Sequence, residues 1–295
     1  MKKWSLFFFV WIAMIACQQV EVNNENKWIP ISAITGNALG SKQWQACDIA
    51  WNTEGTSWKS DQIAAVSSAI EEFNKAELYL HFQRNNSPFL KITFVPSNQL
   101  GKTTTDGLWT FSKPELAEIE GNPQKGYAIL LNAEHPWTPS LLKAVMMNQL
   151  GEILGLPVST EPTSVMYPLV NLSTPIAQLN IEDINLLKKL YPADGRPIVK
   201  TGEPYLESKV HVMEVSVTSL NNIPPTINLG LCWSTTTSSP TVDNMEGRIA
   251  LGTSDLKKIK VSLWEFKNNT RYYLRAYASN TCGVSYGEVV GLLKP

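Results

Sequence analysis

A short segment near the middle of the chain has the spacing with which protein side chains bind zinc. Asn148 and Glu152 are four residues apart, and Gln149 follows the first of them. Val158 lies three residues beyond Gly155. Two histidines at i and i+4 share one face of a helix, and a third beyond a glycine completes a tetrahedral site with one open position. Zinc in such a site lowers the pKa of a bound water, and a neighbouring glutamate takes the proton. The segment therefore has the layout of a hydrolytic zinc site.

The residue types at these positions cannot perform that chemistry. Val158 has no ligand atom, and Asn148 offers only a neutral amide oxygen, which is a poor partner for zinc. Gln149 stands where the catalytic base would be, and its amide accepts no proton near neutral pH. We therefore expect no catalytic residue and no metal at this motif.

Two residues are weak candidates for a displaced metal site. Glu152 keeps a carboxylate on the motif, but a glutamate on a helix is usually solvated or salt-bridged. His135 precedes a Pro-Trp pair, and a lone histidine in such a place is more often a surface or loop residue than a ligand. Zinc enters only under an alternative hypothesis, in which these two side chains bind it with an unrecognised partner.

Two later segments carry a family resemblance. Residues 164–168 read Ser-Val-Met-Tyr-Pro, and residues 179–191 run from an Asn-Ile-Glu-Asp-Ile start to a Leu-Tyr end. Together with Gly155, they resemble the Met-turn and closing helix of the matrixins, a metzincin family of zinc peptidases (peptidase M10), over residues 44–192. The resemblance implies that Met166 forms a packing floor beneath the former metal position. It also implies that the zinc motif is degenerate.

Apolar periodicity predicts the elements that would position this motif. Amphipathic helices are expected at residues 61–74, 139–154 and 181–190, and strands at residues 90–95 and 126–131. The fold class is α+β, a matrixin or zincin-like domain with a mixed sheet plus three helices, over residues 28–192. Without a metal, we expect Leu156, Pro157 and Val158 to pack apolar surface where ligands once stood.

After a turn-rich linker at residues 193–200, the pattern of the chain is all-β. Tyr272, Leu274, Ala276 and Ala278 share one face of a strand with period two. Residues 201–295 resemble a fibronectin type III domain, which implies an immunoglobulin-like sandwich and a corner tyrosine at Tyr272 that bonds a backbone carbonyl. The segment at residues 229–235 is similar to modules of secreted and surface proteins of Bacteroidetes.

The opposite face of that strand alternates cations with aromatic rings. It carries Arg271, Tyr273, Arg275 and Tyr277. One interpretation is a solvated strand face with cross-strand stacking, and the other is a platform for a ligand or glycan.

The N-terminus is typical of an exported lipoprotein. Residues 1–16 combine a basic start with a short apolar stretch, and small residues precede Cys17 as in a lipobox. We expect lipidation at Cys17, a flexible tether at residues 17–27, and a place in the bacterial cell envelope, at the outer membrane on either its periplasmic or its outer side. An ordinary cleaved signal with an incidental cysteine is the alternative. In an exported protein a Cys232–Cys282 disulfide would leave Cys47 unpaired, although the sequence leaves the connectivity open.

Three functions fit these observations. The chain of 295 residues is long enough for two domains, and its formal net charge of −1 suggests no nucleic-acid partner. The first hypothesis is a membrane-anchored pseudopeptidase that binds or scaffolds protein or glycan ligands. The second is a zinc metalloendopeptidase with displaced ligands. The third is an adhesion or polysaccharide-utilisation accessory protein that binds through its C-terminal β domain.

Overall fold

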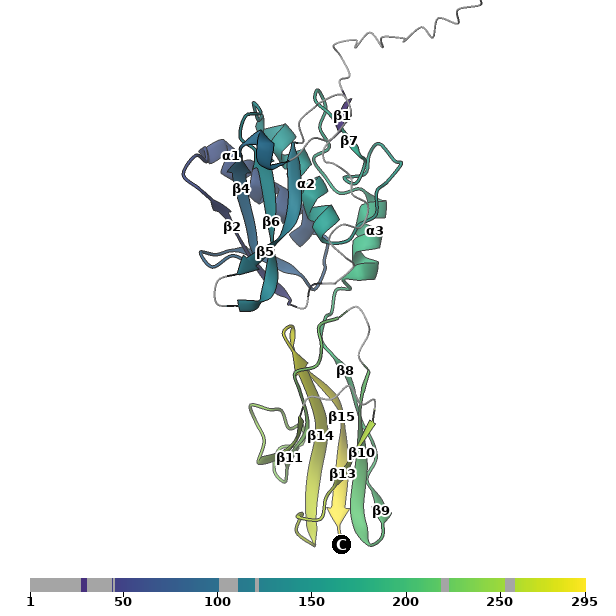
Figure 1. The fold of residues 1–295 in the computed structure, drawn as a ribbon. Helices are drawn as coiled ribbons and strands as arrows, with labels where there is room; N and C mark the ends of the chain where they lie inside the picture. The colour runs from purple at the N-terminus through teal and green to yellow at the C-terminus, as the bar shows by residue number, and fades with distance from the viewer. Residues whose placement is uncertain are drawn as a thin grey trace, which may run out of the picture.

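The computed structural model describes residues 28–30, 44, 46–100, 111–119, 122–218, 223–252 and 258–295. Figure 1 shows two domains arranged end to end, with the C-terminus at the far end of the second. The expected signal segment, Cys17 and the tether lie outside the described residues. Within the described ranges, no helix combines the length and apolar character needed to cross a membrane.

A five-stranded mixed sheet forms the first domain. Its strands are β2 (Asp48–Glu54), β3 (His81–Arg84), β4 (Leu90–Val95), β5 (Ser112–Ile119) and β6 (Asn122–Asn132). The order is β3-β2-β4-β6-β5, with β5 antiparallel to β6 and the other neighbours parallel. Parallel strands are buried on both faces, which is why β4 and β6 read as apolar runs and why Ile92 and Ile129 are fully buried partners.

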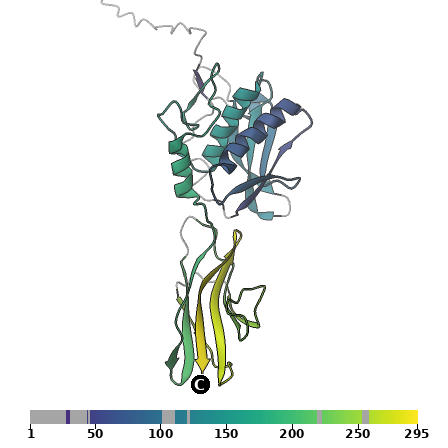
Figure 2. The same ribbon diagram turned by 180° about the vertical axis from the view of Figure 1, so that it is seen from behind.

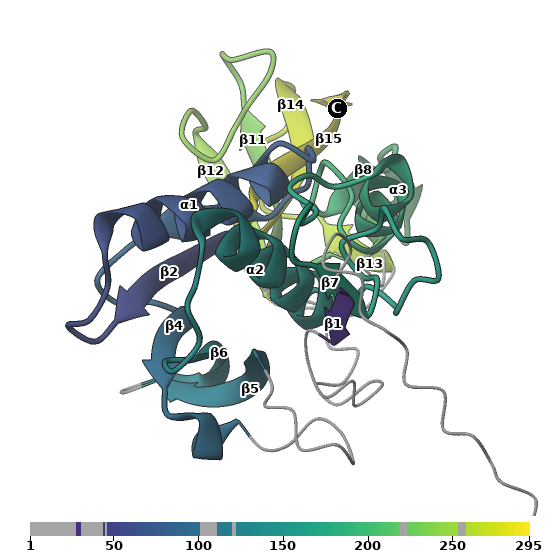
Figure 3. The ribbon, with the colours of Figure 1, turned by 90° about the horizontal axis from the view of Figure 1, so that it is seen from above.

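Three α-helices complete this domain within one residue of the predicted bounds. They are α1 (Ser60–Asn74), α2 (Pro139–Ile153) and α3 (Ile181–Leu190). Figures 2 and 3 show α1 and α2 lying side by side across one face of the sheet. Helix α1 buries Val66, Ile70 and Phe73 there. The remaining elements are a short 3-10 helix, η1 (Ser97–Gln99), and a two-stranded ribbon of β1 (Trp28–Pro30) and β7 (Leu169–Asn171). The expected mixed sheet with three helices is confirmed.

The second domain consists of two antiparallel sheets that enclose their own core. One contains β8 (Ile198–Thr201), β9 (Tyr205–Glu207), β10 (Val210–Thr218) and β13 (Lys258–Ser262). The other contains β11 (Asn228–Ser234), β12 (Gly247–Gly252), β14 (Thr270–Asn280) and β15 (Gly283–Lys294). Strand β8 takes up the last residues of the expected linker.

Strand β14 supplies one wall of this second core. Tyr272, Leu274, Ala276 and Ala278 are all buried, as the period-two pattern predicts. The Tyr272 hydroxyl differs from expectation because it accepts a hydrogen bond from the backbone N–H of Lys267 at 2.9 Å, where a bond to a carbonyl was expected.

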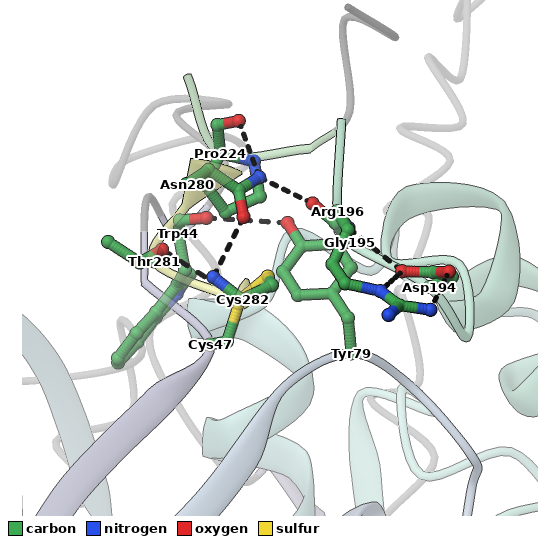
Figure 4. Close-up of a disulfide and its surroundings, with 10 residues drawn as sticks. All are labelled: Trp44, Cys47, Tyr79, Asp194, Gly195, Arg196, Pro224, Asn280, Thr281 and Cys282. Carbon is green, nitrogen blue, oxygen red and sulfur yellow. Dashed lines mark hydrogen bonds and ion pairs between the residues drawn. A yellow bond between two sulfur atoms is a disulfide. The ribbon is translucent and has the colours of Figure 1, made fainter. Parts of the chain in front are cut away.

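The expected Cys232–Cys282 disulfide is wrong. Cys282 is bonded to Cys47 of the first domain (Figure 4), with the two Cα atoms 5.2 Å apart. Cys232 is free and buried. Cys232 in β11 lies opposite Arg275 in β14, and Cys282 comes seven residues after Arg275. Seven extended residues span roughly 23 Å, whereas disulfide-bonded cysteines have Cα atoms within about 7 Å. The strand register therefore rules out the expected pair.

Candidate functional site

The Met-turn is held by a buried carboxylate on α3. The side chain of Asp183 accepts hydrogen bonds from the Ser164 hydroxyl at 2.6 Å and from the backbone N–H of Val165 at 3.0 Å. It also accepts a hydrogen bond from the backbone N–H of Asn180. In return, the Asn180 side chain accepts a hydrogen bond from the backbone N–H of Asp183. We call Ser164, Val165, Asn180 and Asp183 the Asp183 network. It ties the start of α3 to the turn that contains Met166.

Sequence analysis did not predict this role of Asp183. A signal was present, because Asn180 followed three residues later by an acidic residue is a capping-box pattern. The pattern predicts the reciprocal bonds at the helix start. It carries no information about the second set of bonds to residues 164 and 165, which depends on how the turn folds back onto α3.

Helix α2 carries the degenerate motif on its last turns. It begins at the N-cap Thr138, whose hydroxyl accepts from the Leu141 N–H at 3.3 Å, and Pro139 occupies its first turn. It ends where Gly155 adopts a φ of +85°, a conformation that glycine takes without steric cost. Gly155 therefore ends the helix, as its residue type predicts.

Three polar side chains of α2 are brought together at the former metal-binding face. Asn148 donates from its amide nitrogen to the Val165 carbonyl at 2.7 Å. Gln149 donates from its amide nitrogen to the Asn148 amide oxygen at 3.1 Å and to the Glu152 carboxylate at 3.4 Å. We call Asn148, Gln149 and Glu152 the α2 polar cluster. Its bonds run along the helix and to the Met-turn.

Burial shapes the chemistry of this cluster. Gln149 is fully buried, and among the groups that the structure describes its amide oxygen has no hydrogen-bond partner. Burial raises the pKa of the Glu152 carboxyl above its usual range, and the hydrogen bond from Gln149 lowers it by a smaller amount. A raised pKa favours a neutral acid, which is a weaker metal ligand than a carboxylate.

Met166 packs directly against the α2 backbone, as the resemblance implies. A Cβ placed on Gly151 would lie 2.4 Å from the Met166 sulfur and 3.3 Å from a Leu156 methyl carbon. Met166 and Leu156 are both buried. The floor beneath the former metal position is therefore filled by apolar side chains.

The expected packing of the segment after Gly155 is only partly correct. Leu156 is buried, but Pro157 is exposed and Val158 is 50% exposed. The valine at the third histidine position therefore faces solvent and does not fill the site. Its backbone neighbour Ser159 donates to the Met166 carbonyl at 3.1 Å, which fixes the segment to the Met-turn.

The donor set of this site does not fit zinc. The Asn148 amide is held by Val165 and Gln149, and Val158 offers no donor, so Glu152 is the one charged ligand type left on the motif. Within the described part of the chain, no three His, Cys, Asp or Glu side chains lie close enough to hold a metal ion together. The side chains at the described motif positions therefore do not match the ligand set of the family's zinc site.

His135 lies at the other end of α2. Its ring contacts those of Phe111 and Trp137, with centroids 4.5 and 5.0 Å away, and burial lowers its pKa. The helix rises about 1.5 Å per residue, so roughly 20 Å of axis separates Thr138 from Glu152. The structure therefore does not bring the two weak metal candidates together.

The cation and aromatic face of β14 is mostly engaged within the domain. The Arg275 guanidinium donates to the Gly287 carbonyl at 2.8 Å and lies 4.7 Å from the ring centre of Tyr286. Tyr277 is buried, and the Arg271 guanidinium lies over Tyr273 at 5.7 Å. The contact between Arg275 of β14 and Tyr286 of β15 is the cross-strand stacking of the first interpretation, whereas Arg271 and Tyr273 stack along the same strand.

Among the solved structures that match, two are distantly similar. A DUF3823 family protein from Bacteroides ovatus has 11% sequence identity and a TM-score of 0.29, and the match covers 34% of this chain and 56% of that one. A structure described as a myokine has 16% identity and a TM-score of 0.23, covering 34% of this chain and 95% of that one. Comparison with curated proteins gives no match.

The family comparison is more informative. The matrixin family profile (peptidase M10) matches residues 43–192, just over half of the 295 residues. That range contains the mixed sheet, the three helices, the α2 polar cluster and the Met-turn. The chain therefore belongs to the matrixin family.

Proposed function

We propose that this chain is a lipid-anchored matrixin family member whose matrixin domain binds protein or glycan ligands and does not hydrolyse peptides. The observation that carries the proposal is the α2 polar cluster. Asn148 and Gln149 hold amides where a zinc peptidase needs an imidazole and a carboxylate, and the Asn148 amide is already bonded to the Met-turn.

The retained scaffold supports a binding role. The Asp183 network and the packing of Met166 on Gly151 preserve the shape of the domain without metal ligands. Buried hydrogen bonds and apolar contacts supply stability that a metal would otherwise contribute. A domain that has to present a surface needs this scaffold, whereas turnover would also need a ligand set and a base.

The proposed anchor rests on the sequence around Cys17. Two acyl chains hold a protein stably on a bilayer, which favours a cell-envelope location, at the outer membrane. The N-terminal peptide of the cell-derived protein, analysed by mass spectrometry, should carry a diacylglyceryl group on Cys17. The Cys17→Ser variant should lose it, and the Cys232→Ser variant, which changes a buried free thiol, should keep it. An unmodified N-terminal cysteine would contradict the anchor.

The absence of catalysis is tested by metal content and by hydrolysis. The full-length chain, purified in mild detergent without added metal, should contain no zinc by elemental mass spectrometry and should leave a mixed peptide library uncut when zinc is supplied. Stoichiometric zinc together with cleavage would overturn the proposal. In that case Glu152→Ala and His135→Ala show which of the two distant candidates is a ligand by loss of zinc in one of them, and zinc should persist in Glu161→Ala, which changes an exposed carboxylate.

The β domain as the sole ligand-binding part is the remaining candidate. Arg271, Trp264 and Leu293 are among the exposed side chains of this domain that a ligand could contact. Binding of the full-length chain to a glycan array should survive the substitutions Arg271→Ala and Trp264→Ala if the matrixin domain carries the ligand. Loss of binding in both variants would favour the β domain.

A further inference from the structure

The two domains are covalently joined away from their linker. Cys47 immediately precedes β2 in the first domain, and Cys282 lies in the turn between β14 and β15 of the second. The disulfide connects residues separated by 235 positions (Figure 4). The chain therefore passes between the domains once, through residues 193–197, and the disulfide forms a second connection beside it.

The linker packs directly onto this bond. A Cβ placed on Gly195 would lie 2.5 Å from the Cys282 sulfur and 2.7 Å from the Tyr79 ring, so only a glycine fits between them. Asn280 donates from its amide nitrogen to the Gly195 carbonyl at 2.6 Å and to the Pro224 carbonyl at 3.0 Å. Figure 4 shows these groups gathered around the disulfide.

Among the residues that the structure describes, few other contacts restrain the domains. Ile223 of the second domain reaches the core of the first. Among the described residues, no helix or strand of the first domain packs extensively along a strand of the second. Domains with a small shared interface are expected to move relative to each other unless something else holds them. The disulfide is the strongest such restraint here.

A cleft gives access to the bond. It has a volume of about 320 Å³ and is lined by both cysteines together with polar groups such as Asp48, His81 and Arg196. A small thiol can enter a cleft of this size. The free Cys232, by contrast, is buried, and burial raises the pKa of its thiol to about 11, so it forms little thiolate.

We propose that the Cys47–Cys282 disulfide is a redox-controlled lock on the relative orientation of the two domains. The oxidised chain holds one orientation. Reduction frees the domains to turn about residues 193–197, while each keeps its own core. This inference is independent of whether the matrixin domain hydrolyses peptides.

The reduction requires a dithiol. A thiolate of the dithiol attacks one sulfur of the bond, and the other sulfur leaves as a thiolate and takes a proton. The second thiol of the reductant then displaces the remaining protein sulfur and completes its own disulfide. The protein disulfide gains two electrons and two protons, and the dithiol loses the same. In an exported protein the oxidised form is the resting state.

The lock is tested by a distance between two labels. Spin labels are attached without thiol chemistry at the exposed positions Ser68 on α1 and Glu288 on β15 of the full-length chain in detergent. Pulsed electron resonance should give a narrow distance distribution in the oxidised protein. The distribution should broaden after treatment with dithiothreitol, and also in the double variant Cys47→Ser/Cys282→Ser. The Cys232→Ser variant should remain narrow.

Amide hydrogen exchange separates reorientation from unfolding. On reduction, protection should fall at the Cys282 amide, which donates to the Asn280 side chain, and should persist at the α2 amides. An unchanged distance distribution would show that the packing at Gly195 and Asn280 holds the domains without the disulfide, and would overturn the proposal. Loss of protection throughout α2 would overturn it as well, because the bond would then serve folding.

Discussion

Two groups of polar residues form hydrogen bonds to the Met-turn, and they differ in how completely their buried atoms are paired. On one side, both carboxylate oxygens of Asp183 accept hydrogen bonds, so the Asp183 network satisfies the buried charge. On the other side, the α2 polar cluster reaches the turn through Asn148 and leaves the Gln149 amide oxygen without a partner among the described groups. The Asp183 carboxylate is thus paired at both oxygens, whereas the α2 polar cluster keeps a buried acceptor that has no partner among the described groups.

The difference predicts which of the two groups tolerates substitution. A buried carboxylate without partners is costly, so the Asp183 network cannot lose a member cheaply. An amide in a former ligand position is neutral, and a missing bond there costs less than an unpaired charge. Substitutions in the two groups should therefore have different costs, and four measurements test this.

The largest effect is expected at Asp183. The Asp183→Ala variant leaves the Ser164 O–H and the Val165 N–H without their acceptor, although the Ser164 oxygen still accepts from the Met166 N–H, and it should lower the free energy of unfolding by about 3–5 kcal/mol. Urea unfolding followed by helical circular dichroism measures this, because the α-helices among the described residues all belong to the first domain. The neighbouring exposed Glu182→Ala should cost about 0.3–1 kcal/mol through the helix dipole. Equal losses in the two variants would contradict the structural role of Asp183.

The bonds of Asp183 illustrate which features of this fold the sequence predicts and which it does not. The three helices follow from apolar periodicity with capping and stop residues, such as Asn180 before α3 and Gly155 after α2, and these are local signals. The second set of Asp183 bonds joins segments 18 and 19 residues apart and has no local signature. The loss of the zinc motif could be predicted, because it follows from residue types alone.

The disulfide and the exposure of Val158 could not be predicted. Cysteine connectivity depends on which chain segments meet, and Cys47 meets Cys282 only because the linker brings the ends of β2 and β14 together. Val158 is apolar, so its residue type favours burial, yet the turn after Gly155 directs it to solvent. Tertiary arrangement decides both outcomes.

A second measurement compares two neighbours within the α2 polar cluster. Asn148→Ala removes the donor to the buried Val165 carbonyl and should cost about 1–3 kcal/mol of unfolding free energy. Gln149→Met removes a buried oxygen without a partner, which is stabilising, and also the amide donor to Asn148 and Glu152, which is destabilising. Because the two effects oppose each other, its unfolding free energy should lie within about 1 kcal/mol of that of the unsubstituted chain. Both are measured by the same urea titration. A Gln149→Met loss as large as that of Asn148→Ala would show that the glutamine amide is structurally required.

A third measurement tests the contact between Met166 and α2. Gly151→Ala gains about 1 kcal/mol of helix propensity but forces the Met166 sulfur to move, which costs about 1–3 kcal/mol, so a small net loss is expected. Adding Met166→Ala should remove the steric part of that loss, because the coupling between the two sites is then absent. Gly155→Ala serves as the control. Its Cβ meets nothing within 4 Å, so its loss comes from the positive φ and should not respond to Met166→Ala.

The smallest effect is the pH dependence contributed by Glu152. Burial raises the pKa of this carboxyl above 4.5, the ordinary value for glutamate, so between 4.5 and the raised pKa the folded chain binds more protons than the unfolded chain. Stability rises with pH only where the unfolded state binds more protons, so here the contribution of Glu152 must fall as pH rises through that window. The Glu152→Gln variant should therefore lose this decline, and Glu161→Gln, at an exposed position, should keep it. Urea midpoints measured from pH 4 to pH 8 distinguish the two. A decline that persists in Glu152→Gln would place its origin outside the α2 polar cluster. Glu152, the one ionisable residue of that cluster, would then not be the source of the pH dependence of stability.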